Sequence, residues 1–488
     1  MRALERLFRA AERRPWSVTL ALGAPVWIAL VRMLLERYLS LGDAPLGRPP
    51  FPWFAHIVTF YLALLVTLSA LLVVLAKLGW QAAMRQVGMG LTLGTLPPLI
   101  DVLVYGRGRF AYEYRPGFTQ LPWLLHEPPR VLPAGETTVL WLTIALMTYA
   151  TWRATKQPGR ALLTAASTWL LVLLFLVWLP GAAHALSRLT GLAPSEWRNA
   201  LFGLVTVAGV VTCLGLWRRL ATRLPHVLLP GLFVGLGAVE RGPLDGPALL
   251  AALQVLLLAI GFTLANDWYD RKEDEAGGRT TSLTADGAQW LAVVPLVFAA
   301  HVLAFRLELG LALVGFAIVS HAYHSDALRL KCVFPLSYKT EGFLGGLCFL
   351  AGLAAAPERA PTERALWLLL LVTLGTPIAL VFKDWKDVDA DARAGVRTGF
   401  VVGEAHGWAR QSLVRVAALG LGLSLVLVTG WTARVTAAST ASLAALGLLA
   451  LGSPAVLLAV KAPARATQLA MLGAEATLLA SVLLRATA

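Results

Sequence analysis

Residues 255–274 read VLLLAIGFTLANDWYDRKED, an apolar run that passes directly into a cluster of acidic side chains. Residues 371–391 read LVTLGTPIALVFKDWKDVDAD and repeat this arrangement. Three aspartates recur between the two stretches at a constant interval of 117 residues: Asp267, Asp270 and Asp274 correspond to Asp384, Asp387 and Asp391. Carboxylates at positions i, i+3 and i+7 share one face of a helix. The repeat therefore predicts two acidic helix faces, each at the end of an apolar segment.

Two such faces predict a metal-bridged anion site at a membrane surface. Facing carboxylates repel each other, and uncompensated charge is very costly in a medium of low dielectric constant. Mg²⁺ prefers oxygen ligands and usually binds through carboxylates together with substrate phosphates. Bound metal ions would also neutralise the charge that builds on a departing diphosphate. The alternative is a pair of solvated helix ends, which would need no matched spacing.

The composition is that of an integral membrane protein. The chain has 488 residues, of which 57% are hydrophobic and only 14% are charged, and its mean hydropathy is +0.68. A soluble protein is about one quarter charged. Apolar runs of roughly 17–25 residues, the length of a membrane-spanning helix, recur along the whole chain. The short alternating segments of a β-barrel are absent from the sequence, so we predict an all-α polytopic membrane protein.

The net charge of +14 does not require a nucleic-acid partner. The basic residues lie in short loops between apolar runs, as expected when Lys and Arg stay on the cytoplasmic side of a membrane. We therefore expect no nucleic-acid partner. The three cysteines, Cys213, Cys332 and Cys348, lack a CxxC spacing and predict neither a disulfide framework nor a thiolate metal site.

The apolar runs fall into a group of six and a group of nine. The predicted spans are 17–37, 54–76, 87–105, 137–152, 162–180, 199–217, 225–240, 247–266, 287–305, 310–323, 341–356, 365–383, 412–430, 437–459 and 466–486. Basic residues and a proline separate the two groups near Arg218–Pro225. We predict an N-terminal transmembrane bundle over 1–220 and a second transmembrane domain over 221–488.

The distribution of basic residues predicts the topology. With the N-terminus inside, the inner loops collect most of the Lys and Arg residues, and both acidic clusters lie on the cytoplasmic face. The exception is the loop over 106–136, which falls outside although it carries several arginines; we interpret it as a small folded cap of unknown function. We expect a multi-pass protein of a bacterial inner membrane.

A third polar segment, Tyr323-His324-Ser325-Asp326-Ala327-Leu328-Arg329-Leu330-Lys331, lies between the acidic clusters and also follows an apolar run. Arg329 and Lys331 offer fixed positive charge for phosphate oxygens. Tyr323 has a hydroxyl that can donate to the same group. The alternative is simple anchoring of a helix end by basic residues on the inner side.

Together these motifs resemble those of the UbiA superfamily of intramembrane prenyltransferases. The pattern is NDxxDxxxD at 266–274, a Tyr-to-Lys segment, and DxxDxxxD at 384–391. Arg279 after the first motif and the run Gly395-Val396-Arg397-Thr398 after the second are similar to the family as well. The resemblance covers about residues 220–488.

The resemblance implies a nine-helix bundle around a cavity, with Mg²⁺-dependent transfer of an isoprenoid from a prenyl diphosphate to a membrane-soluble, aromatic or lipidic acceptor. Where the family often has prolines, this chain has Asp326-Ala327. By position, the implied metal ligands are Asp267, Asp270, Asp274, Asp384, Asp387 and Asp391. Asp267, Asp270, Asp384 and Asp387 are the implied catalytic residues, and the implied diphosphate ligands are Asn266, Tyr323, Arg329, Lys331 and Arg279.

Two other functions remain open from the residues. A CDP-alcohol phosphotransferase also places aspartates at helix ends. Its motif has an Asp-Gly dipeptide followed by an Ala-Arg dipeptide, whereas here Asp270 precedes Arg271 and Asp387 precedes Val388. A cation-coupled transporter would use the aspartates as ion sites, although transport sites usually lie near the bilayer midplane.

The first six spans resemble no family that we recognise. They are expected to form a docking or lipid-presentation module that delivers the acceptor, or to carry a second activity fused to the transferase. The sequence indicates neither the isoprenoid length nor the oligomeric state.

Overall fold

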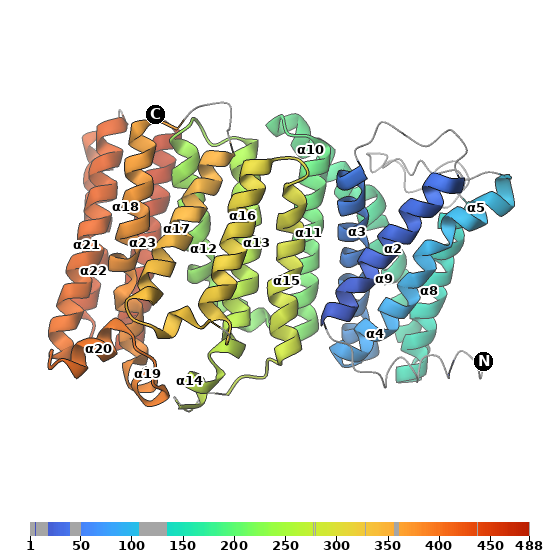
Figure 1. Cartoon of the computed structure of the whole chain (residues 1–488), viewed down its shortest axis with the longest axis horizontal. Coiled ribbons are helices and arrows are strands. Elements are labelled where there is room, and N and C mark those ends of the chain that lie inside the picture. The colour runs from blue at the N-terminus through green and yellow to red at the C-terminus, as the bar shows by residue number, and fades with distance from the viewer. Residues whose placement is uncertain are drawn as a thin grey trace. The chain divides into compact units, whose positions relative to one another are not determined.

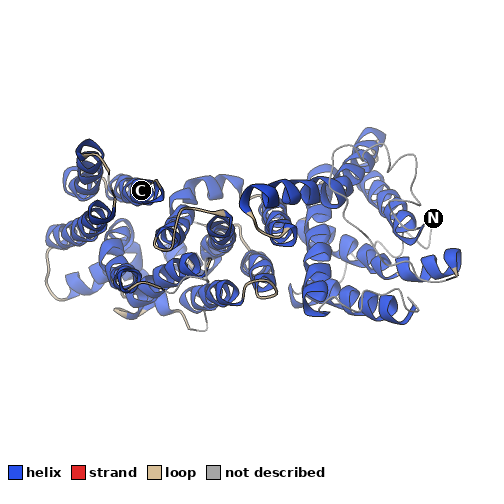
Figure 2. Cartoon of the chain, turned by 90° about the horizontal axis from the view of Figure 1, so that it is seen from above, coloured by secondary structure: helices blue, strands red, loops and turns tan. Residues whose placement is uncertain are grey.

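The computed structural model describes Glu5 and residues 18–39, 50–106, 134–276, 278, 280–326, 328–355, 361–436 and 438–487. Over these ranges the chain is helical and contains no strand (Figure 2), which confirms the predicted all-α class. Each of the fifteen predicted spans overlaps a helical segment. Twelve helices of the described ranges are long and apolar enough to cross a membrane. The chain is therefore an integral, multi-pass membrane protein.

The chain forms two compact units, Met1–Trp217 and Arg218–Ala488. In the described part of the first unit, six helical passes are built from α2 (Val18–Leu39), α3 (Pro50–Leu71) with η1 (Leu72–Ala76), α4 (Trp80–Leu91) with η2 (Thr92–Thr95) and α5 (Pro97–Tyr105), α8 (Ala134–Thr155), α9 (Pro158–Leu173) with η4 (Leu174–Trp178) and α10 (Leu179–Thr190), and α11 (Pro194–Leu214). Helices α3 and α11 pack against each other. The rings of Phe60, Phe175 and Phe202 meet within this core.

The described part of the second unit contains nine long helices. They are α12 (Trp217–Val239), α13 (Gly246–Tyr269), α15 (Ala285–Val302), α16 (Leu307–His324), α17 (Leu336–Ala354), α18 (Glu363–Leu380), α21 (Arg410–Val435), α22 (Thr440–Ala459) and α23 (Pro463–Ala486). Shorter elements join them at one end: α14 (Arg271–Ala276), η5 (Leu330–Cys332), η6 (Val381–Asp387), α19 (Val388–Ala394) and α20 (Gly399–Ala405). Figure 1 shows α14, α19 and α20 at the same end of this bundle, where both acidic clusters lie.

Two glycines let α12 and α17 touch backbone to backbone. A Cβ on Gly237 would lie 2.1 Å from the carbonyl oxygen of Phe349, and one on Gly352 would lie 2.1 Å from that of Val234. Small residues permit this close approach between membrane helices. The contact fixes α17 in the bundle and, with it, the polar side chains that α17 carries near its other end.

A buried ion triad ties three helices at the end of the bundle opposite the acidic clusters. Glu240, whose side chain is completely buried, accepts from Arg485 of α23 and from Arg364 at the start of α18, the latter at 2.7 Å. A buried carboxylate is tolerated only when it is paired and hydrogen-bonded. The triad therefore closes one end of the bundle and leaves the other end for the site.

Candidate functional site

The second unit encloses a hollow of about 1750 Å³, open space at its mouth included. One end is lined by charged side chains: Arg223, Asp270, Glu273, Asp274, Lys331, Glu341, Lys383, Asp384, Lys386, Asp387 and Asp391. The remaining wall is largely apolar and includes Phe233, Phe262, Phe316 and Leu344. The hollow thus has the polarity of a site for a molecule with an ionic head and a hydrocarbon body.

The first acidic motif enters the hollow in a different register from the one predicted. Asn266, Asp270 and Asp274 line it, whereas Asp267 is not among the described lining residues. With 3.6 residues per turn, positions i, i+4 and i+8 also follow one helix face, and the backbone bonds from Asp270 to Asn266 and from Asp274 to Asp270 keep this register through the bend after Tyr269. Asn266, rather than Asp267, therefore faces the site.

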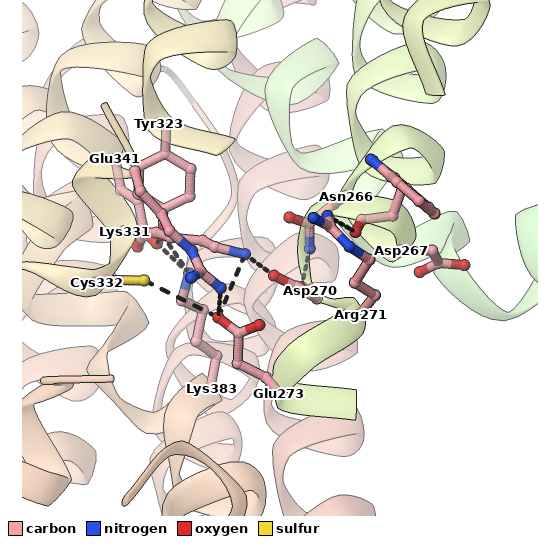
Figure 3. A network of polar contacts seen from close by, with 12 residues as sticks. Asn266, Asp267, Asp270, Arg271, Glu273, Tyr323, Lys331, Cys332, Glu341 and Lys383 are labelled. Atoms are coloured by element: carbon pink, nitrogen blue, oxygen red, sulfur yellow. Dashed lines mark hydrogen bonds and ion pairs between the residues drawn. The ribbon is translucent and has the colours of Figure 1, made fainter. Parts of the chain in front are cut away.

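Asp267 is held by two arginines of α12. It is 4% exposed and pairs with Arg219 and, at 3.0 Å, with Arg223. Figure 3 shows Asp267 pointing away from Lys331, toward which Asp270 turns. Its contacts are those of a residue that fastens α13 to α12, which differs from the position on the acidic wall that the sequence predicted.

The second acidic motif lies in the hollow with all three predicted aspartates. Asp384 and Asp387 belong to the 3₁₀ segment η6, in which side chains three residues apart eclipse each other. The hydroxyl of Tyr338 donates to Asp384 at 2.5 Å and accepts from the Gly399 amide at 2.8 Å. Lys386 lies 2.5 Å from Asp387. Asp384 is thus oriented by α17, an element that the motif itself does not include.

The Tyr-to-Lys segment closes onto the first motif. Lys331 pairs with Asp270 and lies 4.0 Å from Glu273 (Figure 3). Arg329 pairs with the same Glu273 side chain. Burial lowers the pKa of Lys331 to about 8, because the surroundings disfavour the charged ammonium. Lys331 lines the hollow, whereas Arg329 pairs with Glu273 and is not among the described residues that line the hollow.

Tyr323 lines the hollow within a network that the sequence analysis missed. Its hydroxyl donates to Glu341 of α17, and Lys383 of η6 pairs with Glu341 and lies 3.5 Å from the Tyr323 oxygen. The second oxygen of Glu341 is buried and has no hydrogen-bond partner among the described residues. A glutamate and a lysine inside otherwise apolar runs were the signals available in the sequence, because intramembrane charge is usually functional.

The two acidic motifs meet at this site, since α14 and α19 are in contact and both motifs line one hollow. The structure brings together Asn266, Asp270, Asp274, Tyr323, Lys331, Asp384, Asp387 and Asp391. It places Asp267 and Arg329 behind this set. Arg279 lies outside the described residues, as does most of the predicted cap over 106–136.

The donor set suits a hard divalent cation. Carboxylate and amide oxygens are what Mg²⁺ takes from proteins, and the Asn266 amide oxygen and one Glu273 oxygen are buried without a hydrogen-bond partner among the described residues. Over the same residues, no three His, Cys, Asp or Glu side chains are gathered tightly enough to hold an ion as they stand. Instead, Asp270 forms an ion pair with Lys331, and Asp387 forms one with Lys386. The chemistry fits Mg²⁺, and binding would require these lysines to give up their carboxylates.

Comparison with known proteins gave a family match. Residues 227–474 match the profile of the UbiA prenyltransferase family. Among curated proteins, the digeranylgeranylglyceryl phosphate synthase of Methanopyrus kandleri is 27% identical over 181 residues, which are 34% of this chain and 62% of that protein. The chain thus spans less than two thirds of the length of this relative.

Solved structures of UbiA homologs are also similar. A homolog from Archaeoglobus fulgidus bound to DMAPP and Mg²⁺ is 15% identical, with a TM-score of 0.37, over 54% of this chain and 97% of that one. The same homolog bound to GPP and Mg²⁺ gives a TM-score of 0.38 at the same identity and coverage. A solved structure from work on the biosynthesis of digeranylgeranylglyceryl phosphate synthase in membranes is 17% identical, with a TM-score of 0.38, over 60% of this chain and 99% of the solved chain.

Proposed function

The chain belongs to the UbiA prenyltransferase family, and from this premise we propose that its second unit transfers an isoprenoid group from a prenyl diphosphate to an acceptor inside the membrane. The observation that carries the proposal is the hollow of that unit, which joins a charged end to an apolar wall. An isoprenoid diphosphate has the same division into an ionic head and a hydrocarbon tail.

The charge of the hollow supports a metal-dependent reaction. Seven carboxylates and four Lys or Arg side chains line it, so its net charge is negative when all are ionised. An anionic diphosphate would be repelled from such a site at close range, unless divalent cations bound with it. Mg²⁺, held by Asp270, Asp274, Asp384, Asp387 and Asp391 with the Asn266 amide, would supply the positive charge that stabilises the leaving diphosphate.

The basic side chains of the site then act on the diphosphate directly. Lys331 and Lys386 already lie beside Asp270 and Asp387 and can exchange these carboxylates for phosphate oxygens, which an ammonium binds as a point charge. Arg329 pairs with Glu273. Because Arg329 is two residues before Lys331, this ion pair also positions the segment that carries Lys331. The role predicted for Arg279 at the diphosphate stays a prediction.

The apolar wall protects the reacting carbon. As the bond from C1 to the diphosphate oxygen breaks, C1 acquires carbocation character, and water would capture it. Phe233, Phe262 and Phe316 line the hollow and exclude water from the isoprenoid, so that the acceptor nucleophile captures C1. The Tyr323–Glu341–Lys383 network lines the hollow and supplies a buried carboxylate oxygen that can take the acceptor's proton.

The acceptor is proposed only as a class, aromatic or lipidic. The name of the Methanopyrus relative refers to a glyceryl phosphate lipid, so glyceryl phosphate lipids belong in the acceptor panel. From the distribution of basic residues, we propose that the site opens to the cytoplasmic side of a bacterial inner membrane.

The test uses the purified full-length protein with Mg²⁺, labelled allylic diphosphates, and aromatic and lipid acceptors. We expect a prenylated product and release of diphosphate. Asp387→Asn should abolish turnover, whereas Asp389→Asn, the same change in the same segment at a side chain that is 76% exposed, should not. Counterflow of substrate in proteoliposomes without chemical change would favour a transporter instead. Transfer from a CDP-alcohol to an acceptor alcohol with release of CMP, in the absence of prenyl transfer, would favour a phosphotransferase.

A further inference from the structure

The first unit contains a second hollow, separate in sequence from the site described above. It is formed by α2, α3, α4, η2, α8, α9 and η4 and measures about 1060 Å³ with the open space at its mouth. Most of its wall is apolar, with Phe60, Leu64, Leu68, Leu140 and Phe175 among its lining residues. The few charged groups gather at one end, which divides this hollow too into a polar and an apolar part.

Arg32 is the centre of the polar end. Its guanidinium donates to Glu36 at 2.6 Å, to the Tyr61 hydroxyl at 2.8 Å, and to Glu136 at the start of α8. All three of its nitrogens are therefore used. Tyr61 in turn donates to the Gly94 carbonyl at 3.1 Å, and a Cβ on Gly94 would lie 2.5 Å from the Tyr61 ring. The close packing at Gly94 holds Tyr61, and with it Arg32, in place.

The balance of charge at this end sets the head group that the hollow accepts. Two carboxylates, Glu36 and Glu136, surround a single guanidinium, and no other Lys or Arg is among the described lining residues. When all three are ionised, one negative charge remains. The Glu136 side chain is still 23% exposed, so it can accept a further hydrogen bond. An anionic head would meet repulsion here, whereas a hydroxyl or an ammonium would find an acceptor.

The shape of the apolar part fits a chain rather than a compact ring. Residues that line it along α3 run from Phe60 to Leu68, eight positions that correspond to about 12 Å at 1.5 Å per residue. This length is a little less than half of the roughly 30 Å hydrocarbon core of a bilayer. A lipid that enters from the bilayer gains little from burial of its tail, because bilayer chains are as apolar as this wall, so the contacts of the head decide which lipid is preferred.

We propose that the first unit binds a long-chain lipid whose head donates hydrogen bonds and is not anionic, either an alcohol or an amine. The head lies beside Glu136, the more exposed of the two carboxylates, and the tail follows α3 past Phe60, Leu64 and Leu68. The proposal stands on the first unit alone and does not depend on prenyl transfer by the second.

The test is photolabelling of the full-length protein in lipid nanodiscs. The probes share one alkyl chain with a diazirine and an alkyne, and they differ only in the head: hydroxyl, ammonium, carboxylate or phosphate. We expect saturable labelling of the peptide over 53–68 by the hydroxyl or the ammonium probe, at least tenfold above the two anionic probes. The ratio between the hydroxyl and ammonium probes identifies which head the site takes.

Two variants locate the binding. Leu140→Trp fills the tail path and should reduce labelling at least fivefold, whereas Leu162→Trp on the exposed face of α9 should not. Glu136→Gln removes one charge and should reduce the preference against the anionic probes. Equal labelling by all four probes, a preference for the anionic ones, or labelling that does not saturate in the unmodified protein would each overturn the proposal. So would a folded Leu140→Trp protein that labels like its control.

Discussion

Asp267 offers the sharpest test of the site, because the sequence predicts that it binds metal, whereas the structure places it in ion pairs between two helices. The repeat of 117 residues places it on a metal-binding wall. In the structure it is buried against Arg219 and Arg223 instead, while Asp270, one turn of helix away, lines the hollow. The informative pair of variants is therefore Asp267→Asn and Asp270→Asn, which make the same chemical change at neighbouring positions.

The expected effects differ in kind and in size. The Asp267→Asn change keeps an oxygen acceptor but removes the charge, and a hydrogen bond to a charged group is worth about 1.5–3 kcal/mol. The arginine side chains are 35% and 32% exposed, so water screens part of this and we expect a loss of about 1 kcal/mol of stability. At Asp270, loss of a group that stabilises charge in the transition state should reduce kcat/KM by about 10²–10³-fold.

The assay is kcat/KM for the prenyl diphosphate as a function of Mg²⁺ concentration. We expect Asp267→Asn to keep the Mg²⁺ half-saturation of the parent and to lose less than tenfold in kcat/KM. Asp270→Asn should require much more Mg²⁺. If Asp267→Asn raised the Mg²⁺ requirement as strongly as Asp270→Asn, the register described for α13 and α14 would be wrong. The prediction from the sequence, that Asp267, Asp270 and Asp274 bind metal together, would then be correct.

Three other predictions rest on named contacts. Burial gives Lys331 a pKa of about 8, so its positive charge is present at pH 7 and is lost as the pH rises through 8. The value of kcat/KM should therefore fall above pH 8, and Lys331→Arg should move this fall to higher pH. A flat profile up to pH 9.5 would exclude a role for the Lys331 charge in binding the diphosphate. A chelator should weaken binding of a fluorescent prenyl diphosphate at least 100-fold while leaving a prenyl alcohol unaffected, and equal effects on both would count against a metal-dependent diphosphate site. Arg485→Met leaves buried Glu240 with Arg364 as its remaining ion-pair partner among the described residues. The loss of stability should therefore stay below the roughly 3–5 kcal/mol of a wholly unpaired buried charge and should appear as a lower melting temperature. Arg465→Met, exposed on the same helix, is the control, and an equal melting temperature for the two variants would show that the triad does not hold the bundle together.

The sequence predicted the architecture well because spans are set by length and hydropathy alone. A run of about 20 apolar residues must be helical in a bilayer, where no water is present to satisfy its backbone groups. This constraint needs no knowledge of neighbouring helices. The overlap of each predicted span with a helix, α2 and α23 included, follows from it.

The site was less predictable because rotation about a helix axis is decided by packing. The sequence groups Asp267, Asp270 and Asp274 as one face, but Asn266, Asp270 and Asp274 fit the helix equally well. The choice between them depends on Arg219 and Arg223, 48 and 44 residues earlier. No spacing rule within the motif contains that information.

Glu341 and Lys383 were missed for a related reason. Glu341 is the first residue of one predicted span and Lys383 the last residue of another, and the role of each charge depends on a partner from another helix. Lys383 precedes the second motif directly, yet its contacts are with Glu341 and Tyr323 rather than with the aspartates. Only the packing of α16, α17 and η6 brings the three together.

The pairing of lysines with aspartates in the hollow implies that metal and diphosphate bind together. Lys331, whose side chain is 10% exposed, satisfies Asp270, and an ammonium left buried without a partner would be costly. Lys386 is exposed beside Asp387, so its release costs little. Release of Lys331 from Asp270 is therefore favourable only when phosphate oxygens are present to receive it. Asp270, for its part, needs another cation once Lys331 leaves. Each half of the exchange requires the other, so we expect the affinity for the prenyl diphosphate to rise with Mg²⁺ and the affinity for Mg²⁺ to rise with the prenyl diphosphate by the same factor.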